Sequence, residues 1–309
     1  MKKNYKIHDF SIIIILSLIG IILLLSGCTQ KETTNGKTAV IVTIIPQLEM
    51  VTSIGGEYVD VTVMVPAGES PHSFEPTPDQ MINIAQAKAY FTVGSGVEFE
   101  LTHMETILEQ NPDLVLFDCS QDITIISFDE HYGQEHYSEN EKYDHDHTGT
   151  DPHIWTSPVN YKKMAEVVYQ GLVEIDGVHQ ETYFSNYQYL ISSIDSLHEN
   201  ISTRLAPYDG KSFMVYHPAW GYFGDTYNLT MIAIEDEGKQ PGPAGLAAII
   251  NQTRNQNISV IFVSPQFDTS SAQTIADEID GVVAYADPLT SDYKQTLQNI
   301  AQFLISGYS

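Results

Sequence analysis

Residues 179–205 read HQETYFSNYQYLISSIDSLHENISTRL, and this stretch separates two similar halves of the chain. Its apolar residues recur at spacings of three and four, which places one apolar stripe along a helix. They are Tyr183, Tyr187, Leu190, Ile191, Ile194, Leu197 and Ile201. At a rise of 1.5 Å per residue, a helix over this range is about 40 Å long. We therefore predict a rigid connecting helix that is long enough to run along two domains.

On both sides of this helix, short β-branched runs alternate with helical patterns. The runs of the first half are 39–45, 59–65, 89–93 and 114–118, and those of the second half are 212–216, 230–234, 260–263 and 282–285. Most of them are continuously apolar, as expected for parallel strands that are covered on both faces. The predicted fold is therefore α/β, with two Rossmann-like lobes of parallel sheet joined by the long helix. A ligand is expected in the cleft between the lobes, beyond the carboxyl ends of the strands.

The first 27 residues have the pattern of a signal peptide. Lys2, Lys3 and Lys6 precede an apolar run from Ile12 to Leu25, which is only about 21 Å long as a helix. This is short of the roughly 30 Å hydrocarbon core, so a membrane-spanning helix is the weaker interpretation. The sequence Leu25-Ser26-Gly27-Cys28 resembles a lipobox, which implies cleavage before Cys28 and a lipid on its sulfur. Either a lipid or an uncleaved anchor would place the folded part outside the cytoplasmic membrane, on its outer face.

These patterns predict the following division of the chain. It comprises a signal peptide (1–27), a lipidated tether (28–37), an N-terminal lobe (38–158) with a His/acid-rich loop (128–150), a helical connector (159–205) and a C-terminal lobe (206–309).

Composition excludes some classes of function. The chain has 309 residues, with 14 Lys and Arg against 40 Asp and Glu, a formal net charge of −26. Nucleic-acid backbones would repel such a surface, so DNA and RNA are excluded as partners. The two cysteines, Cys28 and Cys119, are too far apart for a CxxC metal site. Any bound metal must therefore be held by histidine and carboxylate side chains.

Four residues that follow strand runs or close a lobe could converge in the cleft. They are His72, His153, His217 and Asp287. Three neutral imidazoles and one carboxylate form a tetrahedral set that suits Zn²⁺ better than Mg²⁺ or Ca²⁺. Taken singly, each residue could instead serve a turn or a hydrogen bond, and Asp287 before Pro288 could be a cap or turn residue.

Several short motifs carry a resemblance to a known family. They are Pro71-His72-x-x-Glu75-Pro76 with Pro78, Asn111-Pro112-Asp113-Leu114, Asp151-Pro152-His153-Ile154-Trp155 with Ser157-Pro158, His217-x-x-Trp220-Gly221-Tyr222-Phe223, Ile261-Phe262-Val263 with Gln266-Phe267, and Asp287-Pro288-Leu289. The motifs occur in this order over residues 38–307. With them, the chain resembles the metal-binding solute-binding proteins of ABC importers, the ZnuA/TroA-like group. The resemblance implies a metal bound between two lobes and delivered to a membrane permease with its ATPase subunit.

The resemblance also bears on the metal. Manganese-binding relatives usually place a carboxylate where this chain has His217, whereas zinc relatives have histidine there. It therefore implies Zn²⁺ as the transported ligand, held by His72, His153, His217 and Asp287. The fourth ligand stays open among Asp287, Glu69, Glu75 and water. A manganese- or iron-binding homologue of the same class is the alternative.

The segment 128–152 contains four further histidines among acidic residues. They are His131, His136, His145 and His147. Such tracts are typical of weak metal binding, and the resemblance implies a low-affinity collector or sensor loop. A solvated acidic loop without a metal is an equal alternative.

Two other classes of function compete with a transport role. A secreted zinc hydrolase would use His72, His153 and His217 with Glu75 or Asp287 as base, but the sequence has no HExxH motif. A surface adhesin would share the same fold. We predict a monomeric binding protein that is not an enzyme.

Overall fold

Two four-stranded parallel sheets form the framework of the chain, as predicted. The structure is a computed structural model that describes residues 36–127, 149–235, 239–267 and 270–308. The first sheet has the order β2-β1-β3-β4 and the second the order β6-β5-β7-β8. The strands are β1 (Thr38–Val42), β2 (Val59–Val63), β3 (Ala89–Thr92), β4 (Val115–Asp118), β5 (Ser212–Val215), β6 (Thr230–Ala233), β7 (Val260–Val263) and β8 (Val282–Tyr285). The two sheets thus repeat one topology, and the predicted α/β class is confirmed.

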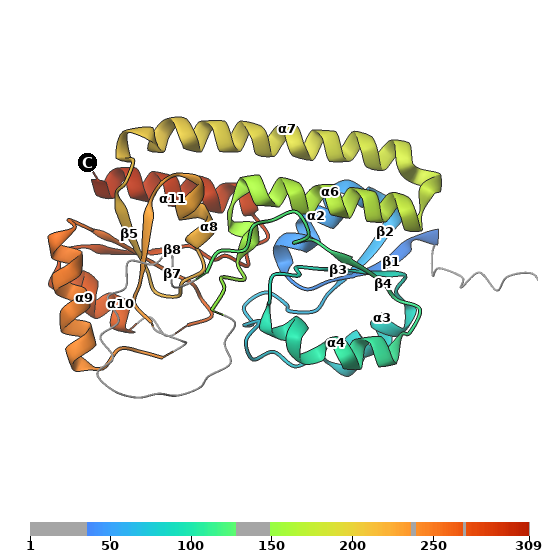
Figure 1. The fold of residues 1–309 in the computed structure, drawn as a ribbon, viewed down its shortest axis with the longest axis horizontal. Coiled ribbons are helices and arrows are strands. Elements are labelled where there is room, and N and C mark those ends of the chain that lie inside the picture. Colours follow the sequence, from blue (N-terminus) through green and yellow to red (C-terminus); the bar gives the residue numbers. More distant parts are fainter. Residues whose placement is uncertain (1–35, 128–148, 236–238, 268–269, 309) are drawn as a thin grey trace, which may run out of the picture. The chain divides into compact units, whose positions relative to one another are not determined.

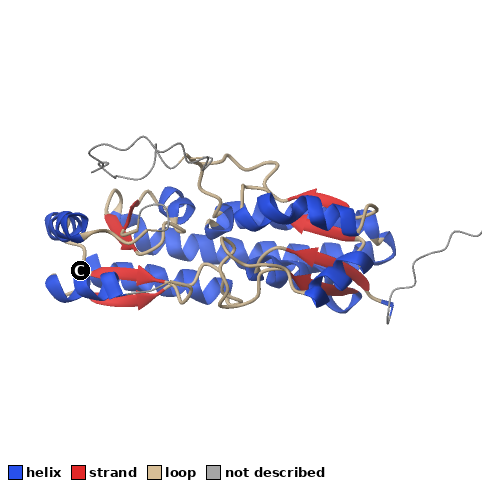
Figure 2. Ribbon diagram, turned by 90° about the horizontal axis from the view of Figure 1, so that it is seen from below, coloured by secondary structure: helices blue, strands red, loops and turns tan. Residues whose placement is uncertain are grey.

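Helices cover both faces of each sheet (Figure 1). In the first lobe they are α2 (Ile45–Gly55), α3 (Pro78–Gln86), α4 (Glu98–Gln110) and α6 (Pro158–Ile175); in the second they are α8 (Gly221–Thr226), α9 (Pro243–Asn255), α10 (Ser270–Glu278) and α11 (Tyr293–Tyr308). Helices α2 and α6 lie on one face of the first sheet, and α3 and α4 lie on the other. Figure 2 shows the strands of each sheet between helices. This arrangement explains why the central strands are continuously apolar, whereas the edge strands β4 and β8 are partly exposed.

Helix α7 (Gln180–Leu205) packs against both lobes. It contacts α2 and α6 of the first lobe and α11 of the second (Figure 1). Its buried residues are Tyr183, Leu190, Ile194, Leu197, Ile201 and Leu205, which follow the apolar stripe in the sequence. One apolar core includes residues of both sheets together with α7, so the lobes share a core. A second apolar cluster lies within the second lobe, between its sheet and helices α9 and α10.

The first strand ends earlier than the sequence pattern predicts. The run 39–45 was predicted as one strand, but β1 ends at Val42 and α2 begins at Ile45. The side chain of Gln47 explains the change, because its Oε1 accepts hydrogen bonds from the backbone N–H groups of Thr43 (3.0 Å) and Ile44 (3.3 Å). Pro46 also lies in the first turn of α2, where its missing N–H costs nothing.

Loops at the carboxyl ends of strands from both sheets line one pocket. The lining residues include His72 after β2, His153 after β4, His217 after β5 and Gln266 after β7. The fold therefore places the predicted histidines on loops that meet between the lobes, as expected for open α/β sheets. Among the described residues, no helix has the length and apolar character needed to cross a membrane.

Replacing Gly171 of α6 by alanine tests the packing of the first lobe. Gly171 lies against the stacked rings of Phe91 and Phe117, whose centroids are 5.1 Å apart. An added Cβ would lie 2.6 Å from Phe91 and 3.0 Å from Phe117. We expect Gly171→Ala to lower the free energy of unfolding by about 1–3 kcal/mol in urea titrations, despite the better helix propensity of alanine. Gly177→Ala is the control, because nothing lies within 4 Å of its added Cβ. Equal stability of the two variants would contradict this account of the packing.

Candidate metal centre

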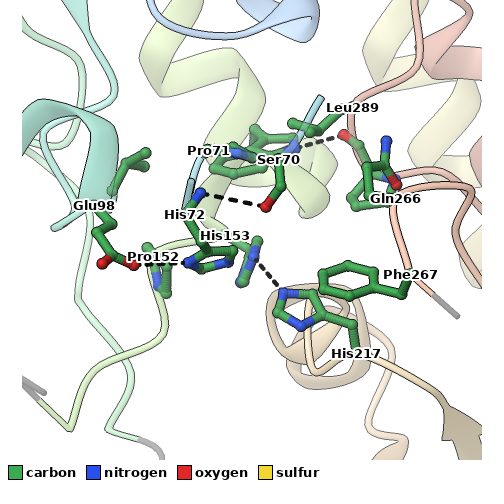
Figure 3. Close-up of a pocket in the computed structure, with 13 residues that line it drawn as sticks. Ser70, Pro71, His72, Glu98, Pro152, His153, His217, Gln266, Phe267 and Leu289 are labelled. Atoms are coloured by element: carbon green, nitrogen blue, oxygen red, sulfur yellow. Dashed lines mark hydrogen bonds and ion pairs between the residues drawn. The ribbon is translucent and has the colours of Figure 1, made fainter. Parts of the chain in front are cut away.

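Three histidines from distant parts of the chain converge in the pocket. His72 lies in the loop between β2 and α3, His153 directly precedes the 3₁₀ turn η3 (Ile154–Thr156), and His217 follows β5. One ring nitrogen from each lies within 4.8 Å of the others. Figure 3 shows the three rings pointing toward one another. In the part of the chain that the structure describes, this is the one group of three or more His, Cys, Asp or Glu side chains with the geometry to hold a metal ion.

The spacing of the nitrogens fits a shared metal ion. The Nε2 atoms of His153 and His217 are 3.4 Å apart. Two nitrogens bound at 2.0–2.1 Å to one tetrahedral zinc ion are separated by about 3.3 Å. The ring of His217 meets those of His72 and His153 edge to face, with centroids 5.3 and 5.2 Å apart. The three rings can therefore point their lone pairs at one atom without stacking on one another.

A carboxylate accepts a hydrogen bond from the other nitrogen of each ring. The Nδ1 of His153 lies 2.8 Å from Oδ1 of Asp151, and that of His72 lies 3.2 Å from Oε2 of Glu98. The Nδ1 of His217 bonds to Glu235. These partners assign the proton of each neutral ring to Nδ1 and leave Nε2 as a free donor for a metal. Carboxylate–histidine pairs of this kind orient metal ligands and raise their basicity.

The two inner carboxylates are buried. Asp151 is 0% exposed and Glu235 is 2% exposed, whereas Glu98 lies near the surface. Asp151 is fixed further, because its Oδ1 also accepts the backbone N–H of His153 at 2.8 Å. Buried carboxylates are costly unless they are paired, so their place beside the rings indicates a site built for positive charge.

Burial favours the neutral form of two of the imidazoles, His72 and His217. Burial lowers the pKa of His217 below its ordinary value of 6.5, the neighbouring His153 lowers it too, and the bond to Glu235 opposes both. Partial burial and the nearness of His217 lower the pKa of His72, against the effect of Glu98. Because both pKa values lie below 6.5, both rings carry free lone pairs at pH 7.

Apolar groups enclose the site. Phe267 stacks on His217 with ring centroids 4.4 Å apart, and Trp155 lies across from His153 at 5.3 Å. The remaining apolar lining residues are Pro71, Val97, Pro152, Pro288 and Leu289. The cavity volume is about 20 Å³, which suits one ion or one water molecule rather than an organic molecule.

The structure differs from the sequence prediction at Asp287. This carboxylate does not join the histidine group. Its Oδ1 instead accepts hydrogen bonds from Nε2 of Gln266 (3.0 Å) and from the backbone N–H of Leu289 (2.9 Å). The second bond is an Asx turn, which an aspartate two residues before the N–H readily forms. Oε1 of Gln266 is buried and has no hydrogen-bond partner among the described residues.

The other predicted residues are not part of the histidine group. Glu69 is exposed, and Glu75 is 82% exposed with its Oε2 3.7 Å from Nε2 of His103. The loop histidines and the lipidation residue lie outside the described residues, and these are His131, His136, His145, His147 and Cys28.

Sequence reasoning missed the three carboxylates that hold the rings. Only Asp151 has a local signal, because it lies two residues before His153 in Asp-Pro-His. Glu98 starts α4 and Glu235 follows β6, positions at which an acidic residue is ordinary. Their role becomes visible only when the strand ends are brought together.

Two α/β lobes around one small pocket are the architecture of a solute-binding protein. The chain belongs to the ZnuA family, described as the periplasmic component A of the zinc-uptake complex, whose sequence profile matches residues 40–306. The family that the motifs suggested is thereby confirmed. It is a family of metal-binding components of metal-uptake systems, which is not a class of enzymes.

Individual relatives agree with this assignment. The high-affinity zinc uptake system protein ZnuA of Bacillus subtilis is 26% identical over 265 residues, which cover 83% of this chain and 82% of the relative. The manganese-binding lipoprotein MntA of Halalkalibacterium halodurans is 25% identical over 266 residues, or 84% and 82% of the two chains. A crystal structure of ZnuA matches with a TM-score of 0.79 and 32% identity, covering 88% of this chain and all of that one.

Replacing Glu235 by glutamine tests the role of the buried carboxylates. The amide keeps the shape of the side chain but removes its charge and weakens the bond to His217. We expect the dissociation constant for Zn²⁺, measured by calorimetry, to rise about 10- to 100-fold. Glu278→Gln is the matched control, because Glu278 is exposed and pairs with Arg254, away from the histidines. Wild-type affinity in the Glu235 variant would show that the carboxylate does not support the ligand.

The affinity for Zn²⁺ should depend on pH in a defined direction. Protons and metal compete for the same lone pairs, and the lowered pKa values of His72 and His217 delay this competition to below pH 6.5. We therefore expect nearly constant affinity between pH 7 and 8 and a progressive loss as the pH falls below 6.5. Calorimetry from pH 8 into the acid range measures it, and an affinity that does not fall with pH while the protein stays folded would exclude imidazole ligands.

Proposed function

We propose that this chain is the extracytoplasmic zinc-binding component of an ABC importer, which captures Zn²⁺ and delivers it to the permease and its ATPase subunit. One observation carries the proposal. Three imidazoles from loops of both lobes point free nitrogens at one place, and each is held there by a carboxylate. This arrangement binds a metal ion between the lobes and gives it up when the lobes' loops shift.

The chemistry of the donors supports zinc over manganese. Imidazole nitrogen suits Zn²⁺, whereas Mn²⁺ prefers carboxylate and water oxygens. The ligand atoms of the convergent group are all histidine nitrogens, and the neighbouring carboxylates are engaged with Nδ1 atoms. The manganese-binding relative makes Mn²⁺ the competing ligand, and competition calorimetry between the two ions decides between them.

We propose His72, His153 and His217 as the ligands that bind directly. Asp287 then does not bind the metal itself. It accepts a hydrogen bond from Gln266 and so holds that side chain at the pocket wall. The fourth coordination position remains for a water molecule or for a carboxylate that moves in on binding.

A transport role explains the pocket better than hydrolysis does. A hydrolase needs a general base near the metal and room for a substrate. Here the carboxylates in contact with the ligands bond to the rings themselves, and the space suits one ion. Turnover of a panel of ester and peptide substrates by the zinc-loaded protein would overturn the transport role. Adhesion is a separate alternative, and it would require binding to a matrix protein that survives loss of the histidines.

The N-terminal segments complete the proposal. A signal peptide and a lipid on Cys28 would tether a monomer to the outer face of the cytoplasmic membrane, beside the permease. The histidines at 131, 136, 145 and 147 would bind Zn²⁺ weakly before it reaches the high-affinity site formed by His72, His153 and His217 (the tight site). Mass spectrometry of the membrane fraction tests the lipid on Cys28.

Substitutions of two histidines separate the tight site from the loop. We expect His217→Ala to weaken Zn²⁺ binding by more than 100-fold, about 3 kcal/mol, because it removes one ligand and leaves Glu235 buried and unpaired. His145→Ala should leave the tight site within about twofold of wild type. Calorimetry on both variants measures the difference. A loss of affinity in the His145 variant with none in the His217 variant would show that the wrong histidines were chosen.

A further inference from the structure

The hydroxyl of Tyr222 joins the two lobes beside the histidines. Tyr222 lies in the first turn of α8, five residues after His217, and it is 3% exposed. Its hydroxyl accepts the backbone N–H of Ile126 at 3.0 Å and donates to the backbone carbonyl of Asp151 at 3.1 Å. Both partners belong to the first lobe, whereas Tyr222 belongs to the second.

Asp151, which accepts the hydrogen bond from Tyr222, also holds the proposed metal ligand His153. Asp151 bonds to His153 through both the ring Nδ1 and the backbone N–H, each at 2.8 Å. The backbone N–H of Asp151 donates in turn to the carbonyl of Ile126 at 2.8 Å. A short chain of bonds thus runs from α8, next to His217, through Asp151 to the ring of His153.

A second bond fixes the other side of His153. Nε1 of Trp155 donates to the backbone carbonyl of Pro288 in the second lobe at 2.7 Å. The residues two positions before and two positions after His153 are therefore both tied to the opposite lobe. On the side of His217, the chain is stiffened by Pro218 and by the bond from the N–H of Ala219 to the carbonyl of His217 at 2.8 Å.

We propose that Tyr222 is a positioning residue for metal binding, whose hydroxyl fixes His153 and His217 at the separation that a shared ion requires. This inference rests on the proposed metal-binding role of the histidines. The two Nε2 atoms already stand 3.4 Å apart, close to the spacing in a bound tetrahedral site. Without the hydroxyl, the loops of the two lobes are less constrained. Ordering them on metal binding then costs free energy, which weakens the affinity.

The hydroxyl is suited to this task because it stays protonated. Burial raises the pKa of Tyr222 well above its ordinary value. At neutral pH it therefore donates to the carbonyl of Asp151 and accepts from the N–H of Ile126.

Tyr222→Phe removes the hydroxyl and keeps the ring. Tyr227→Phe is the matched control, because Tyr227 lies at the other end of α8, is 7% exposed, and bonds through its hydroxyl to Nδ1 of His198 on α7 at 3.3 Å. Both variants lose one buried hydroxyl at an end of α8, but only the first loses a bond to a ligand-bearing segment. Thermal unfolding of the metal-free proteins shows whether each variant is folded.

The test compares Zn²⁺ affinity, the rate of Zn²⁺ release to a chelator, and the visible absorption of the Co²⁺-loaded protein. We expect Tyr222→Phe to raise the Zn²⁺ dissociation constant about tenfold, mainly through faster release, and to weaken the absorption bands of tetrahedral Co²⁺. Tyr227→Phe should match wild type in all three measurements. The spectrum is a readout that a loss of stability alone does not change.

Two results would overturn the inference. One is wild-type affinity and spectrum in Tyr222→Phe, and the other is an equal loss of affinity in both variants, which would assign the effect to general stability. Failure of the proposed function gives a different result, because the wild-type protein itself would then bind neither Zn²⁺ nor Co²⁺ at the histidines.

Discussion

The hydrogen bond between a carboxylate and Nδ1 of each histidine is the interaction on which the candidate site depends. Glu98, Asp151 and Glu235 fix the rings and leave three Nε2 lone pairs directed at one place. Three such lone pairs repel one another, and three carboxylates beside them repel further, unless a cation lies between them. A divalent ion relieves both repulsions at once. A metal ion bound at this place would therefore be favoured by the charge arrangement around it.

The fold brings these six side chains together through its repeated sheet topology. In each lobe, strands of a parallel sheet end at the same edge, so residues far apart in the sequence become neighbours. Helix α7 and the shared core hold the two edges at a fixed separation. Bonds across the lobes, such as that from Trp155 to Pro288, then set the position of His153 at finer scale. We therefore expect capture and release to require local loop movements rather than a wide hinge motion.

Much of this arrangement could be predicted from the sequence, and the exceptions have physical reasons. The strand runs, the stripe along α7 and the three histidines were predicted, because each is marked by local periodicity or by its place after a strand. Asp287 was predicted as a ligand from its place after a strand and from the family resemblance, but the same Asp-Pro-Leu sequence also suits the Asx turn that it forms here. Glu98 and Glu235 could not be found, since they lie 26 and 18 residues from the histidines they hold. Their contacts exist only in the tertiary structure.

We propose above that His72, His153 and His217 bind one zinc ion between the lobes. Crystals of the mature protein grown with one equivalent of Zn²⁺, with diffraction recorded on both sides of the zinc absorption edge, test it most directly. We expect one dominant anomalous peak about 2.0–2.1 Å from the three Nε2 atoms, with the Nδ1 atoms still on their carboxylates. A dominant peak elsewhere in the chain, or one held by carboxylates with the imidazoles turned away, would contradict it.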